Sequence, residues 1–128
     1  MLIKIPVSVG ELADKITILE IKKNKINDKN KLENINNELK HLSIILAKKV
    51  KLDILMKKEI ASLKKINLIL WDIEDDKRKC EKNKKFGPKF IKLARNVYIL
   101  NDKRAQIKFK INNLSGSNII EVKSYDEY

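Results

Sequence analysis

The sequence has little of the residues that crosslink a chain or interrupt its secondary structure. Cys80 is its one cysteine, so no disulfide can form within the chain, and a reducing compartment is expected. Three glycines and two prolines leave little material for a glycine-rich phosphate loop. No apolar run approaches the roughly 20 residues that span a bilayer, and the first ten residues lack an apolar signal core. We expect one cytoplasmic domain over residues 1–128.

Arginine is also scarce, although the chain is strongly basic. The net charge is +12, yet only three of the 29 basic residues are arginines, and Asn and Ile are abundant beside Lys. An A/T-rich genome favours this composition, so much of the charge needs no functional explanation. The arginines, Arg78, Arg95 and Arg104, fall within one short span. Because the planar guanidinium offers five donors in a fork that lysine lacks, we expect all three to have specific partners.

Helix signals occupy most of the chain. Ser8 to Glu11 has the S-x-x-E form of a capping box and begins a predicted helix that runs to about Ile26. Apolar periodicity predicts a second helix over about 29–50, a third of roughly 30 residues after Asp53, and a fourth over about 88–113. Residues 2–7 look extended, and residues 119–123 look like a short strand that could pair with residues 2–6. The predicted fold is all-α, an elongated antiparallel bundle of about four helices.

Charged residues interrupt the apolar stripes of the third and fourth predicted helices. The stripe of the third helix begins with apolar residues and then continues through Asn67, Leu70, Glu74 and Arg78. In the fourth helix, Arg104 occupies a position where the stripe would have an apolar residue. In antiparallel neighbours, this pattern predicts an inward ion pair between Glu74 and Arg104. Such a pair is either a structural clasp or part of a binding site, and the residues leave both open.

One face of the fourth predicted helix is polar. Spacings of three and four place five residues on it: Tyr98, Asn101, Ala105, Lys108 and Asn112. A helix that presents Arg, Lys, Tyr and Asn toward a neighbour could form a cup for a small anion. The alternative is an exposed polar face with some inter-helix hydrogen bonds.

Four blocks of sequence together resemble a known family: PVSVGELADKITILEIK, NLILWDIEDDKR, FIKLARNVYILNDKRAQIKFKIN and EVKSY. In this order, and over nearly the whole chain, they resemble an uncharacterised, mainly bacterial family of small proteins known only as a domain of unknown function. The resemblance implies no activity. Its characteristic positions fall on Gly10, Glu11, Asp14, Lys15, Trp71, Glu74, Asp75, Arg78, Arg95, Tyr98, Asn101, Asp102, Arg104 and Lys108.

The leading hypothesis is a polar pocket between helices that binds an anionic small molecule or the acidic group of a protein partner. The expected ligand contacts are Glu74, Asp75, Arg78, Arg95, Tyr98, Asn101, Arg104 and Lys108. Further candidates are Glu11, Asp14, Lys15, Trp71 and Asp102. No catalytic residue follows from the sequence, and whether the protein is an enzyme stays open.

Paired carboxylates raise the question of a metal. Glu11 with Asp14, and Glu74 with Asp75, could converge from two helices as in helical pyrophosphohydrolases that hold Mg²⁺. The E-x-x-E and E-x-x-D motifs of those enzymes are missing, and capping already accounts for Glu11. We therefore expect neither a metal nor a cofactor.

Two alternative functions remain. The lysine surface could bind nucleic acid, although the lysines are spread along the chain and exposed aromatics for stacking are scarce. A homodimer could form through apolar residues beyond the needs of a small core. The candidates for that face are Ile18, Ile21, Ile44, Ile45 and Ile69.

Overall fold

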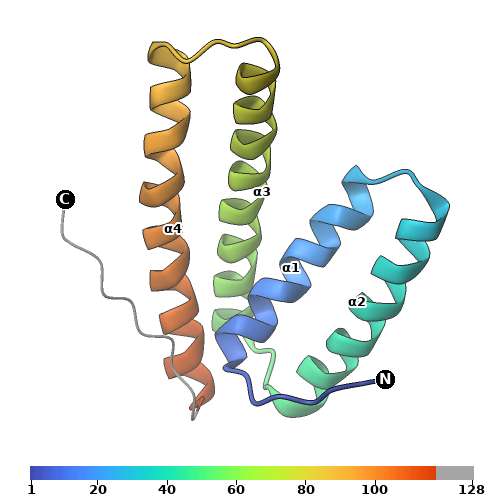
Figure 1. The fold of residues 1–128 in the computed structure, drawn as a ribbon. Helices are drawn as coiled ribbons and strands as arrows, with labels where there is room; N and C mark the ends of the chain where they lie inside the picture. Colours follow the sequence, from blue (N-terminus) through green and yellow to red (C-terminus); the bar gives the residue numbers. More distant parts are fainter. Residues whose placement is uncertain (118–128) are drawn as a thin grey trace.

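The computed structural model describes residues 1–117, which form four helices (Figure 1). These are α1 (Val9–Lys25), α2 (Lys29–Lys49), α3 (Ile54–Lys82) and α4 (Pro88–Ser115). No strand occurs within this described part, so the predicted all-α fold is confirmed, and each helix lies close to its predicted range. The strand expected at 119–123 falls outside the described residues, and so does its expected pairing with residues 2–6.

Local chemistry at the first turn explains where the helices begin. Side-chain oxygens of Ser8, Asp28 and Asp53 each accept a hydrogen bond from the backbone N–H three residues later, at 3.1, 2.9 and 2.9 Å. These caps satisfy amides that the helix itself leaves without partners. At α4, Gly87 precedes Pro88, whose fixed φ suits the first helical position.

The cap of α3 provides a modest stability prediction. Asp53→Ala removes the acceptor for the Met56 amide and is expected to lower the free energy of unfolding by about 1 kcal/mol. Asp53→Asn keeps an acceptor and should behave like the unchanged protein in urea unfolding. Equal losses in the two variants would show that charge, rather than capping, matters at this position.

The helices form two antiparallel hairpins that diverge from a common base (Figure 1). Helices α3 and α4 stand side by side over their length, and α1 packs against their lower half. Within the described residues, α1 contacts all three other helices, whereas α2 runs alongside α1 alone. The upper end of the α3–α4 hairpin therefore projects beyond the α1–α2 hairpin. None of these helices is long and apolar enough to cross a membrane.

The hydrophobic core lies at the base, where α1 crosses α3 and α4. Leu63 and Ile111 are fully buried there and come from α3 and α4. The complete cluster of buried core residues is Ala13, Ile16, Leu46, Val50, Met56, Leu63 and Ile111. The core therefore fixes α1 in the position from which its polar side chains reach α3 and α4.

Some of the apolar residues proposed for a dimer face belong to the protein's own interior. Ile21 is 3% exposed, so it serves the fold of the single chain and that part of the expectation is wrong. Ile44, Ile45 and Ile69 are exposed.

Candidate functional site

Helix α1 lies close to α4 at Gly10. The Gly10 amide donates to Oδ1 of Asn112 at 2.7 Å, and both residues are buried. A Cβ atom on Gly10 would lie 2.6 Å from the backbone carbonyl oxygen of Lys108. Glycine is therefore required here by the close contact between two helix backbones.

Lys108 is a buried cation that points from α4 to α1. Its Nζ donates to Oε2 of Glu11 at 2.7 Å and lies 3.8 Å from Oδ2 of Asp14. The side chains of Lys108 and Asp14 are each 9% exposed, whereas that of Glu11 is 51% exposed. The Ser8 side chain caps α1 as predicted, but the Glu11 carboxylate binds Lys108, so its assignment to capping alone was wrong.

Asn67 of α3 joins α1 to α4. Its Nδ2 donates to Oδ1 of Asp14 at 2.7 Å and to Oγ1 of Thr17 at 2.9 Å. Its Oδ1 accepts a hydrogen bond of 3.1 Å from Nη1 of Arg104. Asn67 is 4% exposed, so both ends of one buried amide are used, each toward a different helix.

Arg104 is half-buried, and within the described residues its side chain donates hydrogen bonds to neutral groups. Besides the bond to Asn67, its Nη2 donates to Oδ1 of Asn101 at 2.8 Å. Among residues 1–117, no carboxylate oxygen lies within 4.0 Å of the guanidinium, whereas Lys108 has two acids around it. We call the set Glu11, Asp14, Thr17, Asn67, Asn101, Arg104, Lys108 and Asn112 the polar junction.

The polar junction leaves no buried polar side-chain atom without a hydrogen bond within the described residues. Complete pairing of this kind avoids the desolvation cost of an orphaned buried group. The polar junction therefore joins three helices in one specific arrangement. The polar face predicted on α4 is the face that meets α1, through Lys108 and Asn112.

The predicted ion pair between Glu74 and Arg104 is wrong. The Glu74 carboxylate accepts from Lys77 at 3.3 Å and is 47% exposed, and Arg104 donates to amides instead. The buried side of α3 continues from Leu70 through Ile73 to Cys80, which turns Glu74 out of it.

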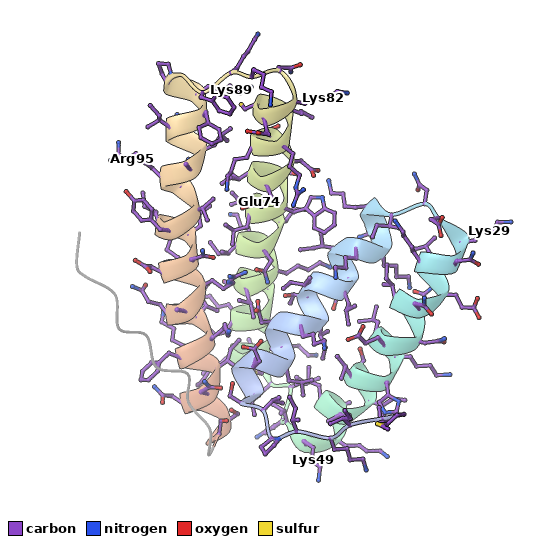
Figure 2. All side chains as sticks on the ribbon, in the orientation of Figure 1. Lys29, Lys49, Glu74, Lys82, Lys89 and Arg95 are labelled. Atoms are coloured by element: carbon purple, nitrogen blue, oxygen red, sulfur yellow. The ribbon has the colours of Figure 1, made fainter. Side chains whose placement is uncertain are left out.

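Several of the other predicted site residues lie at the surface or contact another helix. Asp75, Arg78, Arg95 and Tyr98 are exposed, and Figure 2 shows Arg95 on the side of α4 that faces away from α3. Arg78 and Arg95 therefore lie at the exposed surface, whereas Arg104 belongs to the polar junction. Lys15 turns to α2, where its Nζ lies 3.0 Å from Oε1 of Glu38. Trp71 and Asp102 are half-buried, and no hydrogen bond links either to the polar junction among the described residues.

Sequence reasoning thus found part of the polar junction and missed part. Glu11, Asp14, Asn101, Arg104 and Lys108 were all predicted and do come together. Thr17, Asn67 and Asn112 were not predicted as site residues, although Asn112 was placed on the polar face of the fourth helix. The signal for Asn67 was present, because an amide on an apolar stripe requires a partner when it is buried.

Comparison with known proteins identifies a family without assigning an activity. A family model described as "Family of unknown function (DUF6165)" matches residues 3–128. No curated protein and no solved structure matches the chain. The resemblance expected from the sequence blocks agrees with this match.

Proposed function

We propose that this chain, which belongs to the family of unknown function DUF6165, binds a carboxylate or phosphate group at Arg104. The group would belong to an anionic small molecule or to an acidic protein partner. One observation supports the proposal: Arg104 is a half-buried cation whose partners in the described residues are two neutral amides.

The distribution of charge singles out Arg104 within the polar junction. Glu11 and Asp14 both lie close to Lys108, so its charge already has compensation. The charge of Arg104 has no carboxylate oxygen within 4.0 Å among residues 1–117, and partial burial reduces the screening by water. An anion at this position would therefore interact more strongly with Arg104 than with a fully exposed arginine.

The geometry leaves donors for such an anion. A guanidinium has five N–H donors, and the bonds to Asn67 and Asn101 use one on each terminal nitrogen. Those two amides hold the group in place, so little side-chain entropy is lost when a carboxylate or phosphate binds through two parallel bonds. The proposal keeps Arg104 and Asn101 from the expected contacts and leaves out Glu74, Arg78 and Arg95. It includes no reaction.

The test compares anion-dependent stabilisation of three proteins at constant ionic strength. Inorganic phosphate or citrate replaces sodium chloride in steps, and the melting temperature is measured at each step. At a ligand concentration of ten times Kd, binding stabilises by about 1.4 kcal/mol, a rise of about 5 °C for a domain of this size. We expect this rise in the unchanged protein, its loss in Arg104→Met, and a weaker effect in Arg104→Lys, which keeps charge without the fork.

Arg95→Met is the matched control, because it removes an exposed arginine from the same helix. It should keep the full rise in melting temperature. Side-chain amide signals of Asn67 and Asn101 in NMR spectra should also shift as phosphate is added. Equal stabilisation of Arg104→Met and the unchanged protein, or none in either, would contradict the proposal.

A further inference from the structure

The end of the α3–α4 hairpin carries much of the protein's net charge. Residues 77–89, which we call the hairpin tip, contain seven basic residues and a single acid, Glu81. Their net charge of +6 is half of the +12 of the whole chain. The lysines are spread along the chain, but few acids accompany them within the hairpin tip. Figure 2 shows Lys82 and Lys89 at this projecting end, away from the α1–α2 hairpin.

Many of these charges are free to meet a partner. Lys77, Lys79 and Lys84 have acids at 3.3, 3.8 and 3.7 Å along their own helix or its turn. The remaining basic residues of the tip have no carboxylate within 4.0 Å in residues 1–117 and are exposed: Arg78, Lys82, Lys85 and Lys89. Exposed cations this close together repel one another, so a bound polyanion would relieve that repulsion.

The hairpin tip also forms an open pocket of about 350 Å³. Lys79, Lys85 and Lys89 line it, together with Phe90. Phe86 packs edge-to-face on Phe90, with ring centroids 5.4 Å apart, and remains 48% exposed. Cations beside an accessible aromatic ring are the combination that binds phosphates and stacks bases of single strands.

The turn that shapes the tip holds a lysine where glycine is favoured. Lys84 has φ 55°, and the amides of Lys84 and Lys85 donate to the carbonyls of Glu81 and Cys80 at 3.1 and 2.9 Å. This is the hydrogen-bond pattern of a Schellman helix end, whose left-handed position glycine fills without strain. A basic side chain at such a position costs stability, which is consistent with a role in binding.

We propose that the hairpin tip binds the phosphate backbone of single-stranded nucleic acid, with Phe86 stacking on a base. The positive charge does not end at the tip. Lys92 and Arg95 continue it along α4, and Arg95 lies roughly 10 Å down the helix from Pro88 at 1.5 Å per residue. A flexible strand can follow charges down a helix, whereas a flat membrane surface meets mainly the turn. This proposal does not depend on the Arg104 site, which uses other residues.

The test measures binding of a fluorescent 12-nucleotide single strand by anisotropy between 50 and 200 mM salt. The triple variant Lys82→Gln, Lys85→Gln, Lys89→Gln should lower affinity at 50 mM salt by about tenfold or more, and flatten the dependence of log affinity on log salt by about 2. Phe86→Ala should lower affinity by about fivefold or more without changing that slope. Lys84→Gly should raise the melting temperature and still weaken binding, which separates binding from folding.

The matched control removes three exposed lysines from the other hairpin: Lys23→Gln, Lys29→Gln, Lys31→Gln. It should keep the affinity and slope of the unchanged protein. Absence of binding at 50 mM salt would overturn the proposal. An equal loss of affinity in the control triple variant would also overturn the proposal. It would show that the oligonucleotide is attracted by the positive charge of the whole surface and not by the hairpin tip. Binding to vesicles with anionic lipid, without binding to the oligonucleotide, would assign the tip to membranes instead.

Discussion

Gly10→Ala is expected to lower the free energy of unfolding by about 3 kcal/mol, although alanine is the better helix former. In an exposed helix interior this change usually stabilises by about 0.5–1 kcal/mol. Here the new methyl carbon would lie 2.6 Å from the Lys108 carbonyl oxygen and 3.0 Å from Oδ1 of Asn112. A backbone carbonyl within a helix has little freedom to move, so α1 must shift away from α4. That shift would also stretch the bond from the Gly10 amide to Asn112.

Urea unfolding measures this effect, and Gly87→Ala is its control. No atom lies within 4 Å of a Cβ built on Gly87, whose φ of −81° suits alanine. We expect that variant to lose at most about 1 kcal/mol, from the weaker preference of alanine for the cap position. If Gly10→Ala is as stable as Gly87→Ala, the close packing of α1 on α4 is incorrect.

Lys108→Met should destabilise the protein by about 3–5 kcal/mol, because it leaves buried Asp14 without its nearby cation. Methionine fills a similar volume, so little of this loss would come from a cavity. Lys110→Met, an exposed change of the same kind on the same helix, should have an effect within about 0.5 kcal/mol. Both values come from the midpoint and slope of urea unfolding.

A double variant distinguishes the charge effect from loss of packing. Asp14→Asn combined with Lys108→Met removes both charges, and the asparagine oxygen can still accept from Asn67. The double variant should therefore be more stable than Lys108→Met alone. Additive losses would show instead that each side chain acts through its own packing.

The helix ends were predictable because their causes are local. The capping side chains of α1 and α3, and Gly87 with Pro88, lie within a few residues of the helices that they start. The buried side of α3 was less predictable, because after Leu70 both Ile73 and Glu74 continue a helical spacing. The structure buries Ile73 and leaves Glu74 partly exposed, because burial of an apolar side chain is favourable and burial of an unpaired acid is costly.

The partner of Arg104 depends on the register between two long helices. In an antiparallel hairpin, residues at equal distances from the turn face each other. The turn between α3 and α4 is centred near residue 85, about 19 residues before Arg104. Asn67 lies about as far on the other side, whereas Glu74 is about two helical turns closer to the turn. Simple counting from Gly87-Pro88 therefore favours Asn67. Counting residues could not predict which side chains of α1 join this site, because the position of α1 depends on the packing of the core and on Gly10.

The arrangement in which α2 lies against α1 alone makes stability uneven along the chain. Helix α2 buries only Ile35 and Leu46, and Leu46 belongs to the core at the base. Its opposite end, near Lys29, has one neighbouring helix to hold it. Local opening should therefore begin there and proceed toward the base, while the three helices joined by Asn67 stay closed. Amide protons of the first turns of α2 would exchange with solvent through this partial opening, and those around Leu63 and Ile111 only when the whole domain unfolds.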